Sequence, residues 1–309
     1  MKLASVGAEY LIPLIVEEEG CGWFLVGDFA ESEAETMNDI IFMETAGHIL
    51  ISMLERRRLN RQIHTRLLLE KELQLAADLQ NKVLPRDFQI HNKLDVYGHI
   101  QAHFEIGGDF YDLIPVNDNE LIVCVGDASG KGIPAALLIT HIHAGLRALA
   151  GLGLPLDELV MNLHRLMTRI TMSETFATMF ISRLNLHTGE LQYVNAGHHP
   201  PLLVQASGVT TLDEGCIPLG MLALPDLEVG ERQLEQGDLL FCYTDGLVEQ
   251  SNAKGEILGE DKLQERIHRI RGLEAELVVD NMLGLLRDHR KNQDGVDDIT
   301  LLALKRRNS

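Results

Sequence analysis

The strongest constraint on this chain is a long tract that contains no helix breaker. Neither glycine nor proline occurs between Gly47 and Pro85, and Pro85 ends the tract because proline cannot continue a helix interior. At the other end Ser32 is a suitable N-cap, and Glu35 completes a capping-box pattern. We predict one helix from about Glu33 to Leu84. Such a helix exceeds the usual globular length and is typical of a coiled coil or a helical signalling linker.

The apolar residues of this tract form two adjacent stripes. One stripe contains Leu69, Leu73, Ala76 and Val83, and the second contains Leu68, Leu75 and Leu79. A broad apolar face favours homodimerisation through residues 34–84, together with packing on a neighbouring domain, over a narrow two-stranded zipper. The alternative interpretation is a single helix that lies on its own domain.

The segments on either side of the tract have the patterns of strands and shorter helices, and a length of 309 residues suggests about two domains. Before the tract we predict strands at Tyr10–Val16 and Trp23–Val26, joined by an acidic turn at Glu17–Gly22. The strands predicted after it are Leu94–Ile100, Phe110–Pro115, Leu121–Val125, Phe176–Leu186, Glu190–Asn195, Leu202–Gln205, Leu239–Tyr243 and Ile299–Leu304. The helices predicted there are Pro134–Ala150, Leu156–Thr171, Asp261–Arg269 and Glu274–Arg290. Paired helices between runs of strands predict α+β layers rather than strict βαβ alternation.

Four aspartates stand next to predicted strands at widely separated positions. They are Asp109, Asp127, Asp245 and Asp297. Several like charges that converge at a sheet edge repel one another unless a cation lies among them. Because carboxylate and carbonyl oxygens are hard ligands that suit Mg²⁺ or Mn²⁺, the pattern points to a metal-dependent enzyme that acts on phosphate.

The composition argues against several classes of partner and site. A formal net charge of −19 argues against binding to nucleic acid or to an anionic membrane surface. None of the four cysteines belongs to a CxxC pair, so we expect neither a disulfide framework nor a zinc site, and we expect Cys124 and Cys242 in the core. No apolar stretch approaches the length of a transmembrane helix, and the N-terminus lacks the pattern of a signal peptide. We therefore expect a cytoplasmic protein.

The segment Gly126–Gly132, with the sequence GDASGKG, joins a buried-type strand to a helix. Its glycines allow the backbone to turn tightly around a ligand, although the same pattern occurs in ordinary strand-to-helix turns. Lys131 invites comparison with a nucleotide-binding P-loop, but the GxxxxGK[ST] pattern is absent, so we reject that interpretation. In Asn195–Pro201 the adjacent His198 and His199 have diverging side chains. The asparagine, glycine and prolines favour a structural turn there over a metal site.

Taken together, these motifs resemble those of the metal-dependent protein phosphatase (PPM) superfamily. The motifs are Gly107–Asp112, Val125–Gly132, Asn195–Pro201, Tyr243–Glu249 and Asp297–Thr300. The resemblance covers about Asn92–Lys305, and within the superfamily it is strongest to the bacterial branch of sporulation protein E and the stress sigma-factor regulator phosphatases. It implies a phosphatase domain over residues 92–309, a helical linker over residues 55–91 and a partial GAF-like sensor module over residues 1–54.

The resemblance implies a four-layer α/β/β/α sandwich, in which two antiparallel sheets are flanked by helices and two Mn²⁺ or Mg²⁺ ions bind at one edge. The implied ligands are the carboxylates of Asp109, Asp127, Asp245 and Asp297 and the backbone carbonyl of Ala128. Asp127 is expected to bridge both ions. The implied catalytic residues are Asp109, Asp127 and Asp245, while Asp298 is expected to support its neighbour.

The resemblance also implies a protein serine/threonine phosphatase of bacterial signalling. In such enzymes a hydroxide that bridges the two ions attacks phosphorus in line with the departing oxygen. The implied substrate is a phosphorylated anti-sigma-factor antagonist. Two features differ from eukaryotic members, which carry a histidine at the place of Ser129 and an early phosphate-binding arginine. The bacterial branch commonly lacks both.

Two other functions remain open from the sequence. The first is a non-catalytic dimeric signalling module on a phosphatase fold, which absence of metal binding would favour. The second is a nucleotide cyclase, because Gly107–Phe110 superficially resembles the Gly-Gly-Asp-Glu-Phe hairpin of those enzymes, although the glutamate is missing. Product formation from GTP tests this second possibility.

Overall fold

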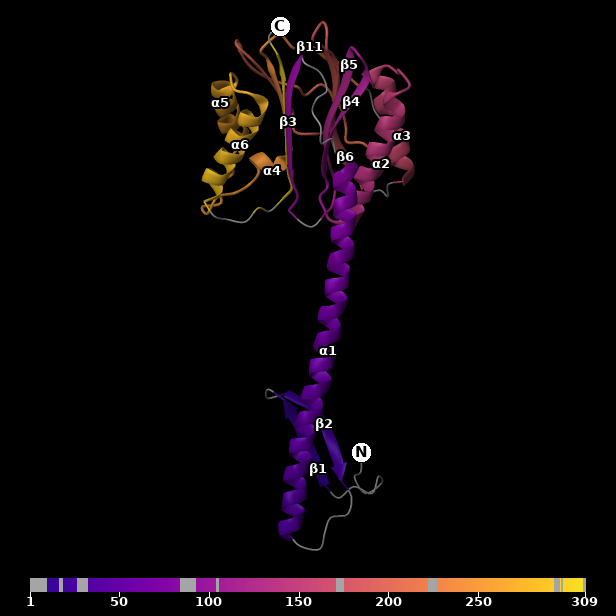
Figure 1. The fold of residues 1–309 in the computed structure, drawn as a ribbon, viewed down its shortest axis with the longest axis vertical. Coiled ribbons are helices and arrows are strands. Elements are labelled where there is room, and N and C mark those ends of the chain that lie inside the picture. Colours follow the sequence, from indigo (N-terminus) through magenta and orange to yellow (C-terminus); the bar gives the residue numbers. More distant parts are fainter. Residues whose placement is uncertain are drawn as a thin grey trace. The chain divides into compact units, whose positions relative to one another are not determined.

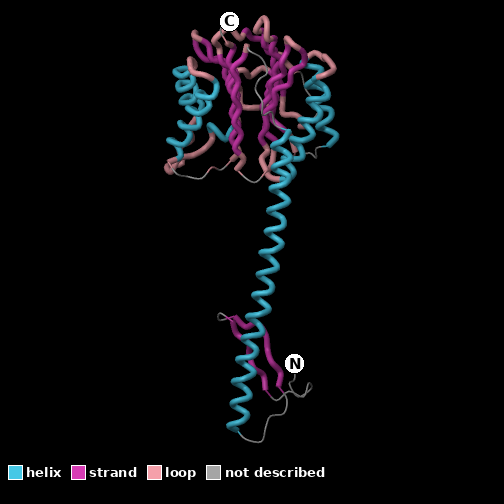
Figure 2. The backbone as a smooth tube through the Cα atoms, viewed as in Figure 1, coloured by secondary structure: helices cyan, strands magenta, loops and turns pink. Residues whose placement is uncertain are grey.

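The computed structural model describes residues 10–16, 19–26, 33–83, 93–103, 106–170, 175–221, 227–291, 295 and 297–307. The chain divides into two compact units, Met1–Glu72 and Leu73–Ser309. Figures 1 and 2 show the path of the backbone and its secondary structure.

The first unit contains a two-stranded antiparallel hairpin and most of a long helix. The strands are β1 (Tyr10–Val16) and β2 (Glu19–Val26), and the helix is α1 (Glu33–Val83). The observed helix matches the predicted range, because nothing in the tract interrupts the backbone hydrogen bonds. The predicted turn at Glu17–Gly22 is too long, since the ladder continues to the pair of Val16 with Glu19.

Several predictions about the long helix and the segments around it stay predictions. The expected N-cap Ser32 and the expected helix end at Pro85 lie outside the described residues. The GAF-like character of residues 1–54 and the proposed domain boundaries stay predictions.

The second unit contains two sheets. The first consists of β4 (Asp109–Asn117), β5 (Glu120–Ala128), β6 (Ala177–Asn185), β7 (Glu190–Ala196), β10 (Gly215–Cys216) and β11 (Gly230–Gln233). The second consists of β3 (Leu94–Gln101), β8 (Leu202–Gln205), β9 (Gly208–Thr211), β12 (Leu239–Tyr243) and β13 (Ile299–Arg306). The strand orders are β10-β7-β6-β5-β4, with β11 also on β7, and β3-β13-β12-β8-β9. All pairs are antiparallel except β10 with β7, which is parallel.

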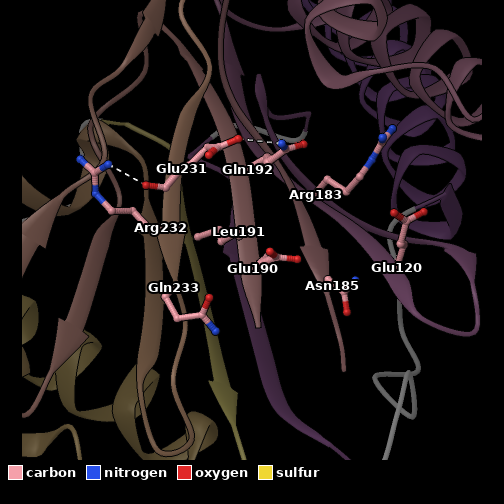
Figure 3. Close-up of a pocket in the computed structure, with 9 residues that line it drawn as sticks. All are labelled: Glu120, Arg183, Asn185, Glu190, Leu191, Gln192, Glu231, Arg232 and Gln233. Carbon is pink, nitrogen blue, oxygen red and sulfur yellow. Dashed lines mark hydrogen bonds between the residues drawn. The ribbon is translucent and has the colours of Figure 1, made fainter. Parts of the chain in front are cut away.

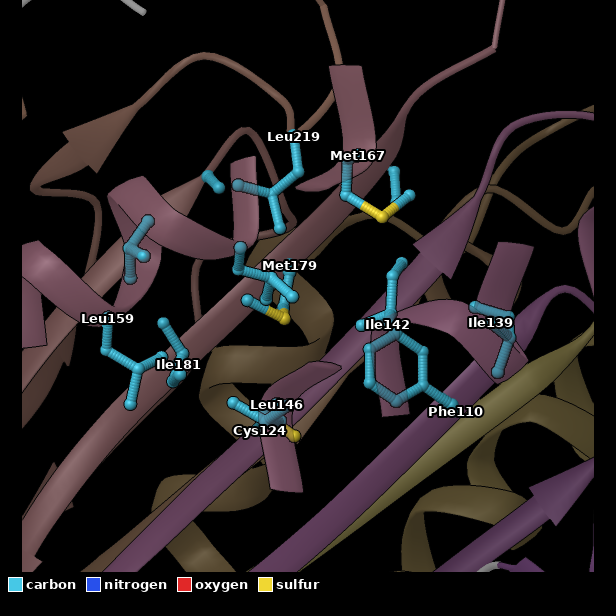
Figure 4. Packing of buried hydrophobic residues seen from close by; sticks show 14 of the residues in the cluster. Phe110, Cys124, Ile139, Ile142, Leu146, Leu159, Met167, Met179, Ile181 and Leu219 are labelled. Carbon is cyan, nitrogen blue, oxygen red and sulfur yellow. The ribbon is translucent and has the colours of Figure 1, made fainter. Parts of the chain in front are cut away.

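Helices cover the outer faces of both sheets (Figures 1 and 2). They are α2 (Ile133–Ala150), α3 (Leu156–Ile170), the short α4 (Asp245–Val248), α5 (Glu260–Ile270) and α6 (Ala275–Arg290). A helix-side core packs α2 and α3 on the first sheet, around Phe110, Ile142 and Leu159 (Figure 4). An inter-sheet core fills the space between the sheets, and a third core packs α5 and α6 on the second sheet. The predicted α/β/β/α sandwich is therefore confirmed.

Two sequence expectations about buried residues have different outcomes. Cys124 and Cys242 are completely buried, as predicted. Contrary to the expectation of no membrane-length segment, α2 is long and apolar enough to span a membrane by length and composition alone. Half of α2 is buried, and its apolar face belongs to the helix-side core, so it is a core helix of the sandwich.

A buried ion pair attaches α2 to the first sheet. Asp112, on β4, is completely buried, and its carboxylate accepts hydrogen bonds from Arg147 Nε at 2.8 Å and Nη2 at 2.9 Å. His143 Nδ1 lies 3.3 Å from the same carboxylate. Although burial opposes the charged form, the nearby His143 ring and the hydrogen bonds from Arg147 hold the pKa of Asp112 below its ordinary value.

We expect Arg147→Met to lower the free energy of unfolding by about 2 kcal/mol at pH 7, because it leaves a buried carboxylate without its bidentate partner. The effect is smaller than for a fully buried ion pair because the Arg147 side chain is 49% exposed. A depressed folded-state pKa stabilises the fold above the ordinary carboxyl pKa, so the difference should shrink as the pH falls below about 4. Urea titrations between pH 3 and 7 measure it, with the exposed Arg165→Met as control. A difference that does not change with pH would contradict this account.

Candidate metal centre between two sheets

Two of the predicted ligands face each other on neighbouring strands of the first sheet. Asp109 opens β4 and is directly paired with Asp127 near the end of β5. Directly opposed residues of an antiparallel pair place their side chains on the same face. Alternation from the inward-facing Tyr111 and Val125 puts both carboxylates on the face toward the second sheet. The two carboxylates therefore lie at the edge of the inter-sheet core, next to its apolar side chains.

The other predicted ligands belong to the second sheet. Asp245 follows β12 as the first residue of α4, and Asp297 precedes β13. Since β12 and β13 are paired, both aspartates stand at the same end of this sheet. At the turn, a Cβ on Gly246 would overlap the backbone carbonyl oxygen of Asp298. This close approach sets how near Asp245 lies to the segment that carries Asp297.

A buried hydroxyl joins the two sheets at this end. Thr244 Oγ1 donates to Asp109 Oδ2 at 2.7 Å, and the backbone N–H of Thr300 donates to Thr244 Oγ1 at 2.9 Å. Asp109 is 2% exposed, and both threonines are completely buried. Thr244 lies two residues after Cys242 of β12, and Thr300 lies two residues before Leu302 of β13, so both face the inter-sheet core. These threonines were not predicted from the sequence, although strand alternation was the available signal.

Asp298 makes a second connection between the sheets. Its Oδ1 accepts a hydrogen bond from the backbone N–H of His103 at 2.7 Å, and its Oδ2 accepts one from Gly108 at 2.6 Å. Both donors belong to the segment that leads into β4. Asp298 therefore ties the backbone beside Asp109 to the start of β13.

The carboxylates disfavour one another's charged forms. Burial is the largest effect on Asp127, whose pKa is raised to about 7. Three neighbouring charges act in the same direction: Asp245, Asp297 and Asp298. Burial, followed by the charge of Asp127, also raises the pKa of Asp109 well above its ordinary value, and the pKa of Asp245 is raised as well. A cation among these groups would relieve this repulsion.

The donor set fits a hard divalent cation because the groups at the site offer oxygen atoms. The backbone carbonyl of Ala128 and the carboxylate of Asp127 face the same space beside Gly108, where a Cβ would lie 3.0 Å and 3.2 Å from their oxygens. Among the described residues, no three acidic, histidine or cysteine side chains are already gathered in ligand geometry.

His198 and Ser129 have structural contacts. The Asn195 side chain accepts a hydrogen bond from the backbone N–H of His198 at 2.7 Å and donates one to the His198 carbonyl at 3.0 Å. These two bonds close a local turn. His198 is buried and contacts Thr178 Oγ1 at 2.9 Å, and burial lowers its pKa to about 3, so it is neutral. The Ser129 hydroxyl accepts a hydrogen bond from the backbone N–H of Phe176 at 2.9 Å.

Two cavities lie at opposite ends of the first sheet. The smaller, about 160 Å³, adjoins the carboxylates and is lined by Ile106, Asp127, Ala128, Ser129, Gly130, Lys131, Gly132, Asp297 and Asp298. The larger, about 460 Å³, is a polar groove that includes Glu120, Arg183 and Glu231 (Figure 3). Glu120 stands at the far end of β5 from Asp127, so the larger cavity is separate from the candidate metal centre.

The comparisons with known proteins agree with this geometry. The family model for stage II sporulation protein E (SpoIIE) matches residues 117–307. Phosphoserine phosphatase RsbU of Bacillus subtilis is 28% identical over 246 residues, which cover 77% of this chain and 71% of RsbU. The RsbU and RsbW domains of Rv1364c from Mycobacterium tuberculosis align with a TM-score of 0.60 and 28% identity, over 69% of this chain and 61% of that chain.

The fold has a further match in the SiaA-PP2C domain of Pseudomonas aeruginosa. The TM-score is 0.68 at 18% identity, and the match covers 80% of this chain and 98% of that domain. The chain thus spans almost all of a PP2C domain but about three fifths of the longer Mycobacterium chain. With a family match over more than half of its length, the chain belongs to the SpoIIE family, and it has the fold of a PP2C-type domain.

Proposed function

We propose that this protein is a cytoplasmic, Mn²⁺- or Mg²⁺-dependent protein serine/threonine phosphatase. The observation that carries the proposal is the meeting of aspartates from two sheets: Asp109 opposes Asp127 on the first, and the charges of Asp245 and Asp297 reach Asp127 from the second. Two bound ions would supply a hydroxide nucleophile near neutral pH and offset charge on the phosphoryl oxygens.

We propose roles for these residues that agree with their positions. Asp127, between the other carboxylates, would bridge the two ions. Asp245 and Asp297 would complete the binding site of one ion. Asp109 and the Ala128 carbonyl would complete the site of the other. In the reaction a water oxygen bonds to phosphorus, the bond to the serine or threonine Oγ breaks, and a proton from the water ends on that oxygen. The products are inorganic phosphate and the free hydroxyl side chain.

The proposed substrate is a phosphorylated anti-sigma-factor antagonist that acts in partner switching. The support is the similarity to RsbU, whose name specifies a phosphoserine phosphatase, and to a chain that contains RsbU and RsbW domains together. The net charge of −19 argues for a protein partner rather than nucleic acid.

Phosphate release from a phosphoserine protein tests the proposal. The full chain is assayed with Mn²⁺, with Mg²⁺ and after chelation, and ion binding is followed by calorimetry. Turnover that requires the ion, with two ions bound per chain, is the expected result. Ion binding without turnover on any phosphoprotein, or no ion binding, would favour the non-catalytic signalling module instead.

We further propose a homodimer formed through residues 34–84. Many large apolar side chains of α1 are more than half exposed within the chain, among them Phe42, Met53, Leu68 and Leu75. Exposed apolar area of this extent marks an interaction surface. These side chains are spread around the helix, which is only weakly amphipathic, so the single broad face expected from the sequence is not seen.

We expect Leu68→Glu with Leu75→Glu to dissociate the dimer, because two carboxylates would enter the apolar contact at half-exposed positions. Light scattering measures the mass of the particle. The matched control is Asn60→Glu with Gln62→Glu, which adds the same charge at exposed polar positions of α1. An unchanged mass in the leucine variant would remove the proposal of dimerisation through this helix.

A further inference from the structure

Lys131 lies in the loop between β5 and α2, within the GDASGKG segment. Gly130 and Gly132, on either side of it, have φ angles of 93° and 72°, a region that favours glycine. A Cβ at either glycine would meet no atom within 4 Å, so close packing does not require them. The glycines instead provide the backbone path that carries Lys131 past the candidate metal centre.

The side chain of Lys131 is directed at the carboxylates. Its Nζ lies 3.1 Å from Asp297 Oδ1, and the two side chains are 52% and 47% exposed. Its charge also lowers the pKa of Asp127. Among the described residues that line the cavity of about 160 Å³, Lys131 is the only basic one. Because ion pairs between exposed side chains are weak, Lys131 can exchange this partner for another anion at small cost.

We propose that Lys131 binds a phosphoryl oxygen of the substrate, an inference that rests on the proposed phosphatase function. The ammonium group contacts Asp297 Oδ1, and a divalent ion held by Asp297 would compete with it for that carboxylate. When Asp297 serves as an ion ligand, Lys131 takes another anionic partner, and the phosphate monoester is the anion that enters this cavity. A lysine ammonium binds phosphate as a compact charge with three donors. It contributes charge and hydrogen bonds, and no proton leaves it.

The competing explanation gives Lys131 a structural role as the counter-ion that orients Asp297. The two explanations differ in their consequences for ion affinity. Loss of an orienting counter-ion would weaken Mn²⁺ binding. Loss of a phosphate-binding cation removes a positive charge beside the ions, so Mn²⁺ binding stays the same or becomes tighter while phosphate binding weakens.

The experiment compares Lys131→Gln and Lys131→Arg with the full wild-type chain. Mn²⁺ and then inorganic phosphate are titrated by calorimetry, and the KM for p-nitrophenyl phosphate is measured at saturating Mn²⁺. We expect Lys131→Gln to weaken phosphate binding and raise KM by about tenfold, with Mn²⁺ affinity no weaker than wild type. Lys131→Arg should retain most of the phosphate affinity. Lys254→Gln, at an exposed lysine in another turn, is the matched control.

Equal phosphate affinity in wild type and Lys131→Gln would overturn the inference, as would weaker Mn²⁺ binding accompanied by unchanged phosphate binding. The phosphate titration requires no turnover. It therefore decides the role of Lys131 even if the wild-type chain hydrolyses nothing, and that result would count against the proposed phosphatase function instead.

Discussion

Asp127→Asn should lower Mn²⁺-dependent phosphate release by about a thousandfold, which corresponds to about 4 kcal/mol of transition-state stabilisation. The variant keeps the shape of the side chain but loses the charge that is proposed to hold both ions. Asp127 is directly opposed to Asp109 on the neighbouring strand, and no other carboxylate stands at its position on β5. Calorimetry should show weaker binding of both ions, and a phosphate-release assay at saturating Mn²⁺ measures the loss of activity.

In the ion-free protein at pH 8, the same substitution should leave the free energy of unfolding unchanged or raise it by about 1 kcal/mol relative to wild type. The pKa of Asp127 is raised to about 7, so its stabilising contribution is present below the ordinary carboxyl pKa and is lost as the pH rises through about 7. Asparagine carries no charge and does not incur this loss. Thermal unfolding after chelation measures the effect. The exposed Asp118→Asn is the control and should change neither quantity. Wild-type turnover in Asp127→Asn would defeat the proposed bridging role.

Gly246→Ala should lower turnover by about a hundredfold without removing any ligand, because small displacements of reacting groups have effects of this size. The added methyl group would overlap the carbonyl oxygen of Asp298 and approach Ile299 Cγ1 at 3.3 Å. Since the obstacle is backbone, the segment that carries Asp297 must move away from Asp245. We also expect the free energy of unfolding to fall by about 2 kcal/mol, a typical cost of overpacking.

The two effects of Gly246→Ala are separable. Urea titration of the ion-free protein reports the packing cost, and Mn²⁺ calorimetry reports the displacement of the ligands. Gly272→Ala is the control, because a Cβ there would meet no atom within 4 Å and its φ angle is not in the glycine-favouring region. A Gly246→Ala variant that loses stability but binds Mn²⁺ like wild type would show that this turn does not set the ligand spacing.

The polar end of the sandwich explains how a repelling group of carboxylates is kept in place. Along most of their length the two sheets are joined by the apolar inter-sheet core. At the carboxylate end they are joined by the hydrogen bonds of Thr244 to Asp109 and of Asp298 to the backbone at His103 and Gly108. Hydrogen bonds to charged groups in buried surroundings are stronger than those between neutral groups. They hold the aspartates near one another despite the raised pKa values.

Local rules predicted most elements of this protein. The long helix follows from a tract without glycine or proline, and the longer strands follow from apolar runs such as Leu121–Val125. The elements that were not predicted from the sequence are β9, β10, β11 and the single turn α4. These elements are short, and several of their residues are polar and partly exposed. They therefore lack the repeated alternation that marks a strand.

The sequence by itself determined which residues are proposed to carry the chemistry: the aspartates were identifiable because each stands beside an apolar strand. Only the tertiary structure decided how they meet. The pairing of Asp109 with Asp127, the overlap that constrains Gly246 and the two hydrogen bonds of Asp298 join residues far apart in the chain. No periodicity along one segment encodes such contacts, because they depend on which strands become neighbours and on the distance between two sheets.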